Sequence, residues 1–140
     1  MLIKLLNQKS NKDILLDDGF LLDVQNLIEY AALLGVSFYF VSGFRKDTNV
    51  QGAIVPPAQK SNHLIGCAFD ADIIHHGKFY NSEALSGVLP EEIKKVIAMW
   101  KGMGNRWGGD FSKKDVVHFD NGLNIKLPDL WRQKYNQYHD

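Results

Sequence analysis

The most informative segment of this chain reads Ser61-Asn62-His63-Leu64-Ile65-Gly66-Cys67-Ala68-Phe69-Asp70 and predicts a turn followed by a strand. Its first half reads as a turn that presents His63. Residues 67–74 then form a predicted strand, which returns Asp70 to the same place. The small residues Gly66 and Ala68 suit a backbone that passes close to a metal site. This segment therefore predicts that His63 and Asp70 lie together.

A second segment supplies the remaining candidates. It reads Trp107-Gly108-Gly109-Asp110-Phe111 and then Asp115-Val116-Val117-His118-Phe119. A strand over 116–119, preceded by a turn at Asp115, would direct Asp115 and His118 into one cleft. His118 lies between apolar neighbours, as Asp70 does, so each needs a hydrogen-bond partner or a metal.

Together these residues have the composition of a hydrolytic metal site. Two imidazoles and one carboxylate are a usual ligand set for catalytic zinc, with water in the fourth position. Zinc lowers the pKa of that water from 15.7 to about 7. We therefore expect His63, Asp70 and His118 to bind one zinc ion that serves peptide-bond hydrolysis. Asp115 is the candidate proton acceptor, and Arg45 is the candidate cation for the developing oxyanion.

Several neighbouring residues have two readings. Ser61 either orients substrate or a ligand through its hydroxyl, or forms a local turn. Asp110 is either an acceptor for a ligand histidine or a turn residue. Cys67 alternates away from Asp70 and is expected to be a small buried apolar residue. The adjacent residues His75 and His76 are not expected to bind one metal ion, because neighbouring strand residues point to opposite faces. They are expected in a solvated loop.

Periodicity indicates an α+β domain. Apolar residues recur at helical spacing in 20–34, ahead of Gly35, which suits a helix C-terminus. Residues 1–19 have no clear period, and 42–62 read as an irregular loop containing Pro56-Pro57. The other predicted elements are strands at 36–41, 67–74 and 116–119 and helices at 89–100 and from 128 onward.

Composition narrows the function classes. The chain has 140 residues, which predicts one domain over 1–140. Sixteen basic and sixteen acidic residues cancel, which argues against a nucleic-acid partner. The single cysteine excludes an intramolecular disulfide and a zinc module built on several cysteines. No segment has the pattern of a signal peptide or a membrane span, so we expect synthesis in the cytoplasm without membrane insertion.

The two motifs, S-x-H-x-x-G-x-A-x-D and W-G-G-D-F…D-x-x-H-F, closely resemble those of the M15 family of zinc peptidases. This family includes bacterial D-Ala-D-Ala carboxypeptidases, and the chain most resembles its small L-alanyl-D-glutamate endopeptidases of phage endolysins and cell-wall hydrolases. The resemblance implies a Hedgehog/DD-peptidase-like fold, with a small antiparallel sheet flanked by helices. It implies that His63, Asp70 and His118 bind zinc, that Asp115 is the acidic catalytic residue and that Arg45 contacts the substrate carbonyl.

The resemblance also implies a function, namely cleavage of the peptidoglycan stem peptide at the L-Ala–D-Glu bond. The expected protein is a monomer without a separate cell-wall-binding domain, which acts on the cell wall after release or export. One alternative is a D-alanyl-D-alanine carboxypeptidase of the same family, and another is a non-catalytic zinc-binding recognition module. Residues 46–60 lack the Glu-Gln pair of many relatives, so no substrate contact is transferred to them.

Overall fold

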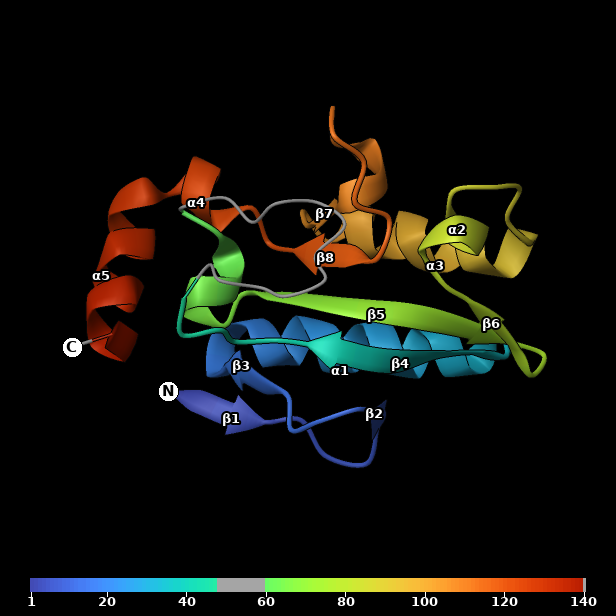
Figure 1. Cartoon of the computed structure of the whole chain (residues 1–140), viewed down its shortest axis with the longest axis horizontal. Coiled ribbons are helices and arrows are strands. Elements are labelled where there is room, and N and C mark those ends of the chain that lie inside the picture. The colour runs from blue at the N-terminus through green and yellow to red at the C-terminus, as the bar shows by residue number, and fades with distance from the viewer. Residues whose placement is uncertain (48–59, 140) are drawn as a thin grey trace.

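A mixed six-stranded sheet forms the centre of the computed structural model, which describes residues 1–47 and 60–139 (Figure 1). Its strand order is β2-β4-β5-β8-β7, and β6 pairs with the distal half of β5. All pairings in this sheet are antiparallel except the short parallel contact between β2 and β4. The strands are β2 (Lys9–Ser10), β4 (Val36–Ser42), β5 (Ala68–His75), β6 (Lys78–Tyr80), β7 (Arg106–Trp107) and β8 (His118–Asp120).

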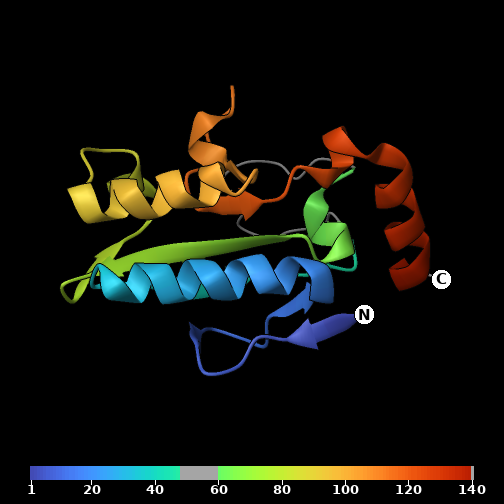
Figure 2. The same cartoon turned by 180° about the vertical axis from the view of Figure 1, so that it is seen from behind.

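The helices lie on one face and at one end of the sheet. The two long helices of the face lie side by side in front of β5 in Figure 2 and contact each other. At the end of the sheet, α5 contacts the 3-10 helix η1 and the short helix α4. The helices are α1 (Asp18–Leu33), η1 (Asn62–Ile65), α2 (Ser82–Leu85), α3 (Glu91–Gly102), η2 (Gly108–Asp110), α4 (Leu123–Lys126) and α5 (Pro128–His139).

Aromatic side chains fill the space between the sheet and its helices. Phe69 of β5 stacks on Phe119 of β8 with ring centroids 4.9 Å apart. Trp100 of α3 and Phe20 of α1 meet edge to face above them, at 5.7 Å. All four side chains are at most 2% exposed. This packing holds β5 and β8, the two strands that carry candidate ligands, in a fixed relation to each other.

The predicted elements agree with the structure in their type. The helix expected at 20–34 is α1, whose first turn is capped by the carboxylate of Asp17, and Gly35 follows it with φ +70°. The strand expected at 116–119 begins later, because residues 116–117 form a turn and β8 starts at His118. The prolines of the expected loop, Pro56-Pro57, lie outside the described residues.

The N-terminal region contains structure that periodicity does not predict. Strand β1 (Leu2–Lys4) pairs with β3 (Leu15–Asp17) in a separate two-stranded antiparallel sheet. Its contact with the rest of the chain includes the amino group of Met1, which donates to the Tyr138 hydroxyl at 2.8 Å. The two ends of the described chain therefore meet (Figure 1). Among the described residues no helix has the length and apolar character needed to cross a membrane.

Candidate metal centre

Three elements bring the candidate ligands together. Asp70 and His118 are directly paired across β5 and β8, so their side chains share one face of the sheet. His63 comes from η1, where the Ser61 hydroxyl accepts the backbone N–H of His63 at 3.2 Å. Ser61 therefore acts as a helix cap, in agreement with the local-turn reading. One nitrogen of each histidine and a carboxylate oxygen of Asp70 lie within 4.8 Å of one another.

A glycine makes the close passage from η1 to β5 possible. Gly66 has φ +71°, a conformation that L-residues with a side chain seldom adopt. A Cβ at this position would also lie 2.7 Å from the backbone nitrogen of Asp17. Gly66 therefore lets His63 and Asp70 approach each other from opposite sides of a tight turn, as the sequence predicts.

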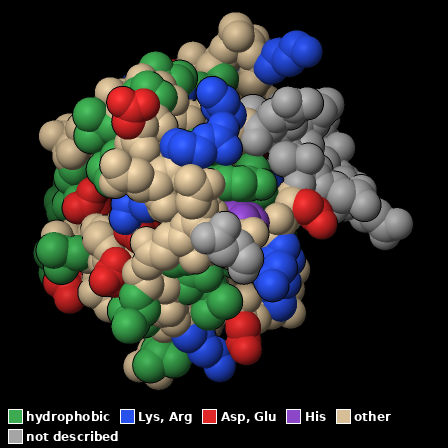
Figure 3. All heavy atoms as spheres, turned by 90° about the vertical axis from the view of Figure 1, so that its left-hand side faces the viewer, with side chains coloured by type: hydrophobic (Ala, Val, Ile, Leu, Met, Phe, Trp, Pro, Cys, Tyr) green, Lys and Arg blue, Asp and Glu red, His purple; other side chains and the backbone are tan. Residues whose placement is uncertain are grey.

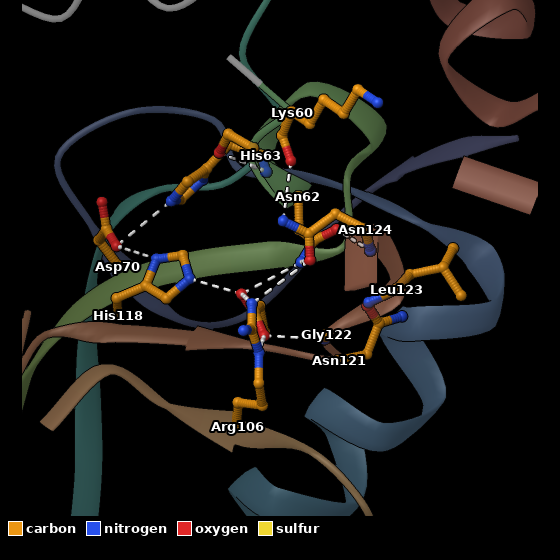
Figure 4. Close-up of polar contacts among 12 residues, drawn as sticks. Lys60, Asn62, His63, Asp70, Arg106, His118, Asn121, Gly122, Leu123 and Asn124 are labelled. Carbon is orange, nitrogen blue, oxygen red and sulfur yellow. Dashed lines mark hydrogen bonds and ion pairs between the residues drawn. The ribbon is translucent and has the colours of Figure 1, made fainter. Parts of the chain in front are cut away.

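The hydrogen bonds assign the two histidine tautomers. His63 Nδ1 donates to the carbonyl of Gly43 at 2.8 Å, and His118 Nε2 donates to Asp120 Oδ2 at 2.8 Å. The opposite nitrogens, His63 Nε2 and His118 Nδ1, each lie 3.3 Å from Asp70 Oδ1 (Figure 4). One nitrogen of each imidazole and one carboxylate oxygen thus converge on one point, with the outer nitrogen of each ring held as in known zinc sites.

The carboxylate of Asp70 divides its two oxygens between different partners. Its Oδ2 accepts from the Arg45 guanidinium at 2.7 Å and from the Ser42 hydroxyl at 3.0 Å. Its Oδ1 faces the histidines. Burial alone would raise the pKa of Asp70, but the neighbouring His63 and His118 hold it well below its ordinary value. The carboxylate is therefore negatively charged, and its Oδ1 atom points toward the ring nitrogens of both histidines.

Asp120 binds the nitrogen of His118 that faces away from Asp70. It accepts a bidentate pair from Arg106 at 2.8 and 2.7 Å, and a bond from the backbone N–H of Gly122 at 2.8 Å. Asn62 of η1 also donates to it, at 3.2 Å. Burial favours the neutral carboxyl group, yet the bonds from His118 and Arg106 outweigh it and lower the pKa of Asp120. Asp120 is thus an ionised, 1% exposed carboxylate that orients a candidate ligand.

The sequence left Asp110 open between an acceptor for a ligand histidine and a turn residue, and it did not point to Asp120. Asp110 is exposed and forms an ion pair with Lys101 at 2.8 Å, so it is not the acceptor at His118. The available signal was the spacing in His118-Phe119-Asp120, because residues i and i+2 of a strand point to the same face.

Asp115 lies in the turn that precedes β8. Its backbone N–H donates to the Gly108 carbonyl at 2.9 Å, and its own carbonyl accepts from His118 N–H at 3.0 Å. Burial raises the pKa of the Asp115 carboxyl group, and the negative charge of Asp70 raises it further. His118, His63 and Arg45 act in the opposite direction. The half-buried carboxyl group therefore lies within electrostatic range of the three candidate ligands.

The two candidate histidine ligands are largely buried. Figure 3 views the molecule from the side that lies to the left in Figure 1, and histidine side chains appear there only as a small patch among other side chains. His63 and His118 are 3% and 8% exposed. A bound cation would therefore lie among largely buried ligands.

Residues 56–121 match a protein-family model described as D-alanyl-D-alanine carboxypeptidase, a model of M15 peptidases. The matched segment contains both motifs, the three candidate ligands and Asp115, and it ends just after Asp120. Arg45 precedes it. The match confirms the resemblance to M15 peptidases, and the α+β architecture agrees with it. No curated protein sequence matches the chain. M15 peptidases are hydrolases, so the match indicates a peptidase.

Proposed function

We propose that this protein is a zinc-dependent peptidoglycan peptidase that cuts the stem peptide at the L-Ala–D-Glu bond. The observation that carries the proposal is the convergence of His63 Nε2, Asp70 Oδ1 and His118 Nδ1, while the outer atoms of all three side chains are bound elsewhere. Two nitrogens and one oxygen fit the donor set of a catalytic zinc site, in which water takes the fourth position. When bound there, zinc would supply an acidified water and a Lewis acid.

The surrounding residues would transfer the proton, contact the substrate and orient a ligand. Asp115, whose carboxyl group interacts electrostatically with the ligands, would take the proton from the attacking water and pass it to the leaving amine. Arg45 uses its Nη2 group for Asp70 and Ser42. A guanidinium carries five N–H donors, so Arg45 has others with which to contact the substrate carbonyl and its developing negative charge. Asp120 would keep the His118 ring in its binding orientation.

A D-alanyl-D-alanine carboxypeptidase is the second candidate, because the matching family model carries that description. Both enzymes would act on the same stem peptide in the cell wall, and both could work as monomers with the same centre. They differ in the bond that the cleft positions over the ligands. Release or export to the cell wall is part of either proposal.

Digestion of purified peptidoglycan tests these proposals. The protein is loaded with one equivalent of zinc, incubated with the polymer, and the new peptide termini are identified by mass spectrometry. New N-terminal D-Glu supports the endopeptidase, and free D-Ala supports the carboxypeptidase. Zinc binding without any new terminus would contradict both and leave a non-catalytic zinc-binding module. A parallel sample treated with chelator controls for metal-independent release.

A further inference from the structure

A second cluster of metal-binding side chains lies at the far end of β5. His75 is the last residue of β5, His76 follows it, and Glu92 lies in the first turn of α3. One ligand atom from each of the three lies within 4.8 Å of the others. The hairpin of β5 and β6 that carries the histidines is at the opposite end of the sheet from α5 (Figure 1).

The turn geometry brings the two histidines to the same side. His75 pairs with Lys78, so His76 and Gly77 are the two central residues of a tight hairpin turn. Both have positive φ, 51° and 76°, as a type I′ turn requires. Because His76 has left the strand, its ring does not point to the opposite face, and the two ring centroids are 4.1 Å apart. The expectation of a solvated loop is wrong for His75, which is 8% exposed.

Glu92, the third member of the cluster, already contacts His75. His75 Nε2 and Glu92 Oε1 lie 3.1 Å apart. The Glu92 backbone N–H and the bond with His75 lower the pKa of the Glu92 carboxyl group, and the charge of His76 adds to this effect. His76 in turn packs near the end of α1, where its Cε1 would be 3.8 Å from a Cβ at Gly35. Two imidazoles and an ionised carboxylate are thus held together by elements distant in sequence.

We propose that His75, His76 and Glu92 form a second metal site, for a divalent transition-metal ion of the zinc, nickel or copper class. Two imidazoles with one carboxylate favour these ions over magnesium or calcium, which prefer oxygen ligands. Half-exposed Glu92 and exposed His76 leave room for water ligands. Binding requires that the proton between His75 Nε2 and Glu92 leave that nitrogen.

This site is separate from the candidate metal centre. Asp70 and His75 are five residues apart on one strand, which corresponds to about 17 Å at roughly 3.3 Å per residue. One ion therefore cannot serve both, and the second site does not depend on the proposed peptidase activity.

Metal stoichiometry measured on the whole protein tests the proposal. The protein is equilibrated with zinc, dialysed, and analysed for bound metal by elemental mass spectrometry. We expect two equivalents in the wild type and one in His76→Asn, because Asn tolerates the positive φ of this turn and removes the imidazole. Glu92→Gln should lower the affinity for the second equivalent at least about tenfold. Loss of a residue that only supports a ligand already has an effect of that size. Lys78→Asn, on the same hairpin, should retain two equivalents.

The possible outcomes separate this site from the first one. Peptidoglycan cleavage by His76→Asn should equal that of the wild type. If the proposed peptidase centre binds no zinc, the count becomes one in the wild type and none in His76→Asn, and the second site still stands. An equal count in the wild type and His76→Asn, whether one or two, overturns the proposal. Ring nitrogen signals of His75 and His76 that shift with added zinc in NMR spectra would identify the ligands directly.

Discussion

His118 and Asp120 lie on the same strand, two residues apart, and the Nε2 atom of His118 is 2.8 Å from Oδ2 of Asp120. This bond leaves Nδ1 of His118 as the nitrogen that faces Asp70 and His63. Burial lowers the pKa of His118, but the bonds with Asp120 and Asp70 outweigh it and raise that pKa to about 9. The ring is thus oriented by one carboxylate toward another, and a metal ion that binds there would displace the proton from Nδ1.

Replacing Asp120 by Asn should weaken metal binding without removing a ligand. The amide loses the negative charge opposite His118 and competes for its ring orientation, so zinc affinity should fall about 10- to 100-fold. Competition with a chromophoric chelator measures this change. Asp110→Asn is the matched control, since Asp110 contacts Lys101 on the surface and should leave affinity unaltered. Equal affinities in the two variants would contradict the role assigned to Asp120.

Cys67 should be unreactive in the folded protein. Burial raises the pKa of its thiol to about 12, and the nearby charge of Asp17 contributes in the same direction. At pH 8 the thiolate fraction is therefore about 10⁻⁴, and the thiolate is the nucleophile. We expect alkylation by iodoacetamide to be negligible in native protein and complete in urea, as measured by intact mass. Rapid alkylation of the native protein would contradict the burial of Cys67.

The raised pKa of Cys67 also predicts that the free energy of unfolding depends on pH. The folded-state pKa is higher than that of the unfolded chain, so the contribution of Cys67 is fully present below the unfolded value of about 9. It is lost as the pH rises toward 12, because the unfolded chain releases the proton first. Urea unfolding of Cys67→Ala and wild type between pH 8 and 11 should show the steeper decline in the wild type.

Gly108→Ala should displace the turn that carries Asp115. A Cβ on Gly108 would lie about 2.1 Å from the Asp115 carbonyl oxygen, a contact that only a backbone shift can relieve. We expect a loss of about 1–3 kcal/mol in the free energy of unfolding, as for other overpacked sites, together with reduced peptidoglycan cleavage. Gly102→Ala is the matched control, because a Cβ there meets no atom within 4 Å and Ala favours the helix. Equal stabilities in both variants would contradict the predicted clash.

The sequence predicted the long elements and the candidate ligands because their signals are local. Helix α1 has apolar residues at helical spacing, and β5 is rich in apolar residues on either side of Asp70. Short strands such as β2 and β7 have two residues each, too few for any period to appear. Their existence depends on pairing with distant strands, which periodicity does not encode.

Contacts between distant residues explain the remaining differences at the candidate site. The binding of Arg45 to Asp70 joins positions 25 residues apart, and the bond from Asn62 to Asp120 spans 58. Neither follows from spacing. His75 and His76 were misplaced for another reason, because the strand rule of alternating faces ends where the hairpin turn begins.

Asp115→Ala should separate hydrolysis from metal binding. The turn at this position is held by backbone groups of Asp115, which the substitution retains, so the fold and His118 should stay in place. Removing a half-buried carboxyl group whose charged form is disfavoured by burial should not lower stability. Zinc affinity should therefore remain close to that of the wild type, while the turnover number on peptidoglycan falls at least about 10²-fold, the usual contribution of a general base. Asp110→Ala, measured alongside, should retain wild-type turnover. Full activity of Asp115→Ala would show that another group accepts the proton, whereas a loss of zinc together with activity would assign Asp115 to metal binding.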